Sequence, residues 1–209
     1  MERITTIEKA KEIMGINFIG PQELSLVSDK MSFDIPDEIP CIRYSSEELM
    51  KHKDDYILVL GLSKMSNGEA INIKLLRSLF GVNPVISEPC FYNQDWYMNE
   101  TFVDKVLEDN WYLIQKNISK ETRGKTPEKN SKNILPSAIL CAFVFFVNYY
   151  CNNNELLWEK DFVWCSDVDE NNDIIYVGRY IDVTGFSKNG FSVHRHLKIR
   201  DNYGAISCL

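Results

Sequence analysis

The residues best suited to chemistry are two histidines near the end of the sequence, His194 and His196, which are separated by one arginine. In an extended strand, side chains two positions apart point to the same face of the sheet. Segment 191–200 alternates in this way, and only Arg195 interrupts its apolar side. The pattern predicts a strand over 191–200 with one face in the core (Phe191, Val193, Leu197 and Ile199) and one cationic face (Ser192, His194, His196, Lys198 and Arg200).

The cationic face is the candidate ligand-binding site. We expect His194, His196, Lys198 and Arg200 to bind an acidic ligand or an acidic protein partner, because a row of basic side chains attracts anions. A strand face that is simply solvated explains the same alternation, so this alternative stays open.

A metal site at the two histidines is the sharper alternative, since His-x-His on a strand aims both imidazoles the same way. A zinc site needs roughly three or four protein ligands. The third histidine, His52, lies in a lysine-rich helix end, and Lys198 and Arg200 would repel a cation. We therefore predict no metal and no cofactor.

Segment 167–173 has acidic and amide side chains at alternate positions, as in the first half of a calcium loop: Asp167, Asp169, Asn171 and Asp173. The sixth position is Asn172 instead of glycine, and the twelfth is Gly178 instead of glutamate. The segment is therefore predicted to be the turn of a β-hairpin.

Cysteine chemistry has one candidate, Cys165, which adjacent strands could bring near His194 and His196. Packing of Cys165 in the core beside Trp164 is the favoured interpretation. The six cysteines are scattered and show no Cys-x-x-Cys spacing, so we expect reduced thiols and a cytoplasmic location.

The elements that must position these residues are a helix and a set of strands. Residues 138–147 carry no charge and are too few to span a membrane, so 136–150 is predicted to be a helix buried on all sides. Strands are predicted at 162–165, 174–177 and 191–200, with turns at 167–173 and 187–190. Together they form an antiparallel meander packed on the helix.

The N-terminal portion alternates predicted helices and strands, with strands at 56–60 and 111–116 and helices at 6–14, 45–51, 71–79 and 100–108. The fold class is therefore α+β. The expected organisation is an α/β portion at 1–118, a polar loop or linker at 119–133, and the helix with its meander at 134–209. One continuous domain is the alternative.

The C-terminal part, about 111–209, resembles bacterial C-type-lectin-like domains. The matching pieces are Leu135-Pro136-Ser137 at a helix start, Trp164-Cys165-Ser166 in a strand, and the closing segment 196–203. The chain lacks a disulfide pattern and the calcium-and-sugar tripeptides of that family, which argues against lectin activity. The chain also resembles proteins of gut bacteria to which no activity is assigned.

Composition excludes several classes of function. A formal net charge of −7 argues against a general nucleic-acid binder, which needs excess lysine and arginine to neutralise phosphates. No apolar run is long enough to cross a membrane. The leading hypothesis is a binding or interaction protein without catalytic activity, and the alternative is a small hydrolase or nuclease that uses the His194/His196 face.

Overall fold

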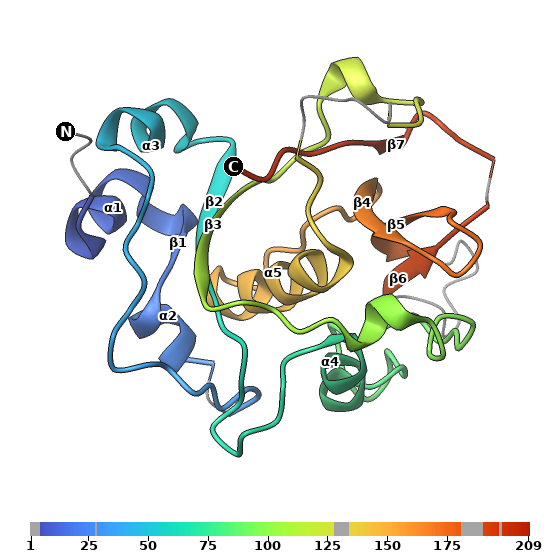
Figure 1. Cartoon of the computed structure of the whole chain (residues 1–209), viewed down its shortest axis with the longest axis horizontal. Helices are drawn as coiled ribbons and strands as arrows, with labels where there is room; N and C mark the ends of the chain where they lie inside the picture. The colour runs from blue at the N-terminus through green and yellow to red at the C-terminus, as the bar shows by residue number, and fades with distance from the viewer. Residues whose placement is uncertain (1–4, 28, 128–133, 181–189, 197) are drawn as a thin grey trace.

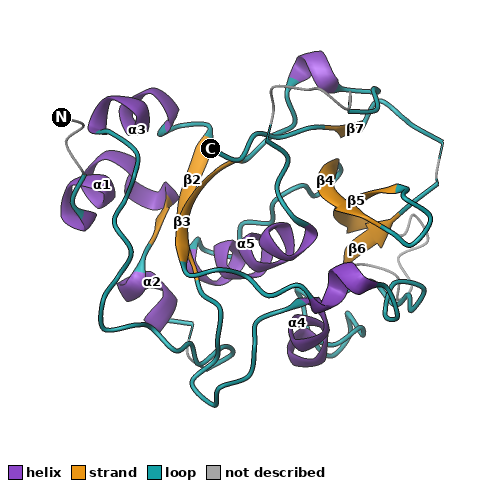
Figure 2. Ribbon diagram, viewed as in Figure 1, coloured by secondary structure: helices purple, strands orange, loops and turns teal. Residues whose placement is uncertain are grey.

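Two β-sheets lie on either side of one central helix, α5 (Ala138–Cys151) (Figure 1). The computed structural model describes residues 5–27, 29–127, 134–180, 190–196 and 198–209. Both sheets contain parallel and antiparallel strand pairs, and helices are interspersed with them, which confirms the α+β class (Figure 2).

Helix α5 begins after Ser137, whose side chain accepts a hydrogen bond from the backbone N–H of Leu140. Every residue from Ala138 to Asn148 is buried. A helix without charge has no face that favours water, so it must be covered on all sides. Strands of both sheets contact it, namely β2, β4, β5 and β6. The buried helix predicted from the sequence is confirmed.

The first sheet has the order β1-β2-β3. Strand β1 (Phe18–Ile19) is parallel to β2 (Tyr56–Gly61), which pairs antiparallel with β3 (Asn110–Gln115). All six residues of β2 are buried, as its continuous apolar run predicts. Four helices belong to this part of the chain: α1 (Ile7–Met14), α2 (Pro21–Ser25), α3 (Ser46–His52) and α4 (Ile73–Phe80).

The second sheet has the order β6-β5-β4-β7. Strands β4 (Phe162–Val168), β5 (Ile174–Tyr180) and β6 (Gly190–His194) form the antiparallel meander, and the short β7 (Tyr203–Gly204) runs parallel to β4. Strand β4 is longer than predicted, so the hairpin turn shortens to 169–173. The turn predicted at 187–190 lies outside the described residues, apart from Gly190.

Two predicted elements are wrong. Segment 100–108 forms only the 3₁₀ turn Thr101–Asp104, because Lys105 already has an extended backbone (φ −61°, ψ 132°). The single turn is enough to bury Phe102 and Val103. The strand predicted over 191–200 ends at His194. Two further 3₁₀ turns are Gly15–Asn17 and Lys120–Thr122.

The C-terminal tail joins the two sheets. Beyond β7 it reaches the first sheet, where Cys208 pairs with Ile114 and the N–H of Leu209 donates to Leu113 O at 3.0 Å (Figure 1). One cluster of buried apolar residues includes both sheets and α5. The division at 119–133 stays a prediction. None of the described helices is both long enough and apolar enough to cross a membrane.

Candidate functional site

The face of the second sheet that points away from α5 carries an aromatic cluster. Along β4 and β5, alternate side chains belong either to the main core or to this outer face. The main core receives Val163, Cys165, Ile175 and Val177. The outer face receives Phe162, Trp164 and Tyr176, and Tyr203 of β7 joins them.

His194 packs on this aromatic cluster. Its ring centroid lies 5.3 Å from that of Phe162 and 5.7 Å from that of Tyr176. Burial lowers the pKa of His194 to about 4, so the imidazole is neutral at neutral pH. Its buried Nε2 has no hydrogen-bond partner in the described part of the chain. His194 therefore contributes a ring and no positive charge.

The four predicted ligand-binding residues do not share one strand face. Ser192 and His194 lie opposite Phe191 and Val193, as the alternation predicts, but β6 ends at His194. His196 then has a left-handed backbone with φ 60°, which turns the chain out of the strand. Lys198 and Arg200 follow in an exposed, non-strand segment. The prediction for Leu197 lies outside the described residues.

Arg195 explains why the strand ends there. Its Nη1 lies 2.5 Å from Oδ2 of Asp169 and 3.1 Å from Oε1 of Glu100. The guanidinium carbon lies 4.3 Å from the centre of the Trp96 ring, within cation–π range. The charged group thus has buried partners that continued strand pairing would not give it.

The hairpin turn at 169–173 is organised by the carboxylate of Asp169. Its Oδ1 accepts hydrogen bonds from the backbone N–H groups of Asn171 at 2.8 Å and Asp173 at 2.9 Å. Burial alone would raise the pKa of Asp169, but these hydrogen bonds and the Arg195 guanidinium lower it overall. Asp169 is therefore an ionised carboxylate with a side chain that is 0% exposed.

Asp167 does not belong to the turn. It lies in β4, where its Oδ2 accepts a hydrogen bond of 2.6 Å from the N–H of Ala138, in the first turn of α5. Its Oδ1 lies 2.5 Å from Nζ of Lys105. The alternation that resembles a calcium loop is therefore divided between a strand and a turn.

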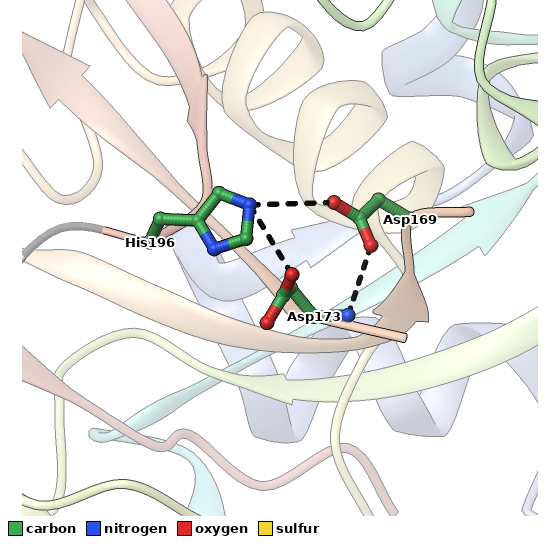
Figure 3. A group of neighbouring side chains, drawn as sticks. All are labelled: Asp169, Asp173 and His196. Atoms are coloured by element: carbon green, nitrogen blue, oxygen red, sulfur yellow. Dashed lines mark hydrogen bonds and ion pairs between the residues drawn. The ribbon is translucent and has the colours of Figure 1, made fainter. Parts of the chain in front are cut away.

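His196 faces both aspartates of the turn, Asp169 and Asp173 (Figure 3). Its Nε2 is 3.2 Å from Oδ2 of Asp173 and 3.9 Å from Oδ2 of Asp169. One ligand atom from each of the three side chains can be chosen so that all lie within 4.8 Å of one another. Imidazole nitrogen and carboxylate oxygen are both common metal ligands.

A cleft of about 330 Å³ adjoins this group. Asp173 and His196 form part of its wall, together with the polar residues Thr126 and Asn172. The apolar part of the wall consists of Trp164, Ile174, Tyr176 and Ile199. Trp164 and Tyr176 are almost fully buried, so these two residues of the aromatic cluster form the base of the cleft. The cleft thus combines an apolar base with a polar, ionisable rim.

Cys165 faces away from the cleft. It lies in the main core with 1% exposure, on the opposite face of the sheet from His194, and burial raises its pKa well above the ordinary thiol value. The interpretation as a core residue is confirmed. None of the six cysteines forms a disulfide, and all six lie in the described part of the chain.

Sequence reasoning missed the pairing of His196 with the hairpin turn. The signal was present in the register of the meander, because Tyr176 of β5 pairs with His194 of β6. In an antiparallel pair, the residues that follow His194 lie beside the residues that precede Tyr176. His196 therefore comes close to Asp173. Sequence reasoning also missed the cleft, since its wall combines residues from four separate segments.

Comparison with known proteins gives no family for this chain: no family model matches it, and no curated protein or solved structure is significantly similar.

Proposed function

We propose that the chain is a binding protein without catalytic activity that holds a small acidic ligand at the cleft lined by the hairpin turn, His196 and Ile199. The observation that carries this proposal is the cleft itself. Ligand sites are typically about 300–1,000 Å³, mostly apolar, with a few polar groups that orient the ligand. A volume of about 330 Å³ with Asp173 and His196 on the rim suits a compact molecule.

Two basic residues beside the cleft favour a negatively charged ligand. Lys198 and Arg200 are exposed and flank Ile199, which lines the cleft. Neither has an ion pair within the described residues, whereas Arg195 is held by Glu100 and Asp169. A carboxylate, phosphate or sulfate group could therefore bind Lys198 and Arg200 without first breaking an existing ion pair.

The proposal is tested by calorimetry and thermal shift with small dicarboxylates, nucleoside monophosphates and sulfated sugars. We expect at least one of these classes to stabilise the wild type, less so in high salt, and the variant Lys198→Ala/Arg200→Ala to lose most of the shift. Lys51→Ala/Lys53→Ala, which removes two exposed cations from the region of α3, is the matched control and should retain it. Equal stabilisation of both double variants, or no stabilisation of any of these proteins by any probe, would refute the proposal.

The cytoplasmic location stays a prediction.

A second candidate function, hydrolysis, is favoured by one observation. Nε2 of His196 lies 3.2 Å from Oδ2 of Asp173 at the rim of the cleft, and a carboxylate that orients an imidazole is a recurrent arrangement for general acid–base catalysis. His194 would not take part, because its ring is packed on Phe162 and Tyr176. Turnover of nitrophenyl esters or phosphodiesters that is lost in His196→Ala and kept in His52→Ala would establish this function instead.

A further inference from the structure

Three potential metal ligands meet at the edge of the cleft from two segments of the chain. Two ligands bound to one ion at about 2.0–2.2 Å lie roughly 3 to 3.5 Å apart. Nε2 of His196 and Oδ2 of Asp173 are 3.2 Å apart, and Oδ2 of Asp169 is 3.9 Å from the same nitrogen. One ligand atom from each of the three side chains lies within 4.8 Å of the others, and rotation of the exposed imidazole would shorten the longer of its two distances.

Oδ2 of Asp169 has one lone-pair position left at which it could bind a metal ion. A carboxylate offers about four lone-pair positions. Two on Oδ1 are used by the N–H groups of Asn171 and Asp173, and one on Oδ2 is used by Arg195. The distance from Oδ2 to Nε2 of His196 is too long for a hydrogen bond, so the fourth position has no partner among these groups. The same contacts fix the orientation of the carboxylate, as outer contacts commonly do at metal sites.

The local charge also favours a divalent cation. Three carboxylates surround the site, from Glu100, Asp169 and Asp173, and Arg195 supplies the one guanidinium that pairs with two of them. These three carboxylates and the guanidinium together leave two negative charges, which one divalent ion would balance. Lys198 and Arg200 flank Ile199 of the same cleft and oppose a cation, but β6 ends at His194 and neither side chain forms an ion pair with Asp169 or Asp173.

We propose that Asp169, Asp173 and His196 bind one first-row divalent transition-metal ion at the edge of the cleft. One imidazole nitrogen with two carboxylate oxygens suits zinc, cobalt, iron or manganese, whereas calcium and magnesium favour oxygen ligands alone. Three protein ligands leave at least one coordination position open. Because Asp173 and His196 line the cleft, that position lies where water or an acidic group of a ligand could occupy it.

The inference deepens the proposed function but does not depend on the ligand's being acidic. The test therefore uses the metal alone. The untagged chain of residues 1–209 with Cys41→Ser, which removes the exposed thiol, is dialysed against chelator and titrated with Co²⁺. We expect one Co²⁺ per chain with visible d–d absorption, displaced by Zn²⁺ and not by Mg²⁺ or Ca²⁺.

Ligand assignment rests on two variants and one direct measurement. His196→Ala and Asp173→Asn alter side chains that are exposed or half-exposed and should weaken the metal at least about tenfold, while His52→Ala should leave affinity unchanged. In the wild type, Zn²⁺ should shift the imidazole ¹⁵N resonances of His196 and not those of His52, whether or not the variants fold. Failure of the wild type to bind Co²⁺ and Zn²⁺, or equal affinity in His196→Ala, would overturn the proposal.

The metal and the acidic ligand are separated by repeating the thermal shifts with excess chelator. Stabilisation by the acid that persists in chelator, together with no Co²⁺ binding, would leave the binding function standing and remove the metal. Co²⁺ binding without stabilisation by any acid would leave the metal site standing and remove the proposed binding of an acidic ligand.

Discussion

Nη1 of Arg195 lies 2.5 Å from Oδ2 of Asp169, a carboxylate with a fully buried side chain. The same nitrogen lies 3.1 Å from Glu100, and Trp96 covers the guanidinium. A single side chain at the end of β6 thus joins the hairpin turn to the segment that precedes β3. The turn that carries Asp173 is held in place by this junction.

Replacing Arg195 with leucine is expected to lower the melting temperature by several degrees. The change leaves two buried carboxylates, Asp169 and Glu100, without their cationic partner, and an unpaired buried charge is strongly unfavourable. Lys9→Ala removes an exposed pair with Glu12 and should have almost no effect. Comparable melting temperatures for the two variants would show that the Arg195 junction contributes nothing to stability.

His194 is expected to make the protein less stable in acid. Its pKa is about 4 when folded and 6.5 in the unfolded chain, so between these values the unfolded state takes up a proton that the folded state does not. Stability from this group is complete above pH 6.5 and falls as the pH falls towards 4, by up to about 3 kcal/mol.

The comparison with His194→Phe isolates that contribution, because phenylalanine keeps a ring against Phe162 and Tyr176 and cannot be protonated. Urea denaturation of both proteins should give a difference in unfolding free energy that changes between pH 6.5 and 4. The same slope in both proteins would mean that His194 is not buried as a neutral ring.

Much of the fold could be predicted because its signals are local. The uncharged run 138–147 and the apolar run 56–60 each have one physical solution, which is burial, and both are buried. The helix predicted at 100–108 failed for a tertiary reason. Phe102 and Val103 reach the core from one 3₁₀ turn, and Val106, which a helix would place on the same face, is 44% exposed.

The candidate site was predicted in part. The alternation placed Ser192 and His194 on the outer face, but it could not reveal that Arg195 has buried partners far away in sequence, Glu100 and Asp169. Because Arg195 pairs with these partners, β6 ends at His194 and His196 lies at the hairpin turn. The alternation of side chains along a strand gives no information about ion pairs between distant segments. The cationic face was therefore predicted to extend to Arg200, whereas β6 ends at His194.

The aromatic contacts of α5 predict a large effect of Phe146→Ala. The Phe146 ring is fully buried, stacks on Phe80 at 3.9 Å and lies 5.1 Å from Phe91. Deleting such a ring is expected to cost about 3–5 kcal/mol of unfolding free energy. Tyr149→Ala, at a half-buried position of the same helix, should cost less. If urea denaturation ranked the two variants the other way round, the placement of α5 between the sheets would be wrong.

Gly178 in the middle of β5 is expected to tolerate no side chain. It pairs with Phe162 on β4, and a Cβ atom there would lie 2.2 Å from the carbonyl oxygen of Asp161, a backbone atom that cannot rotate away. Gly178→Ala must therefore displace β4 from β5 and should cost about 1–3 kcal/mol of unfolding free energy, as overpacking usually does.

Gly178→Ala should also weaken binding at the cleft, because Trp164 and Tyr176 of these two strands form its base. Ser166→Ala, at an exposed position of β4, is the control and should change neither property. Wild-type stability in Gly178→Ala would show that the two strands are not as close as the pairing of Gly178 with Phe162 requires.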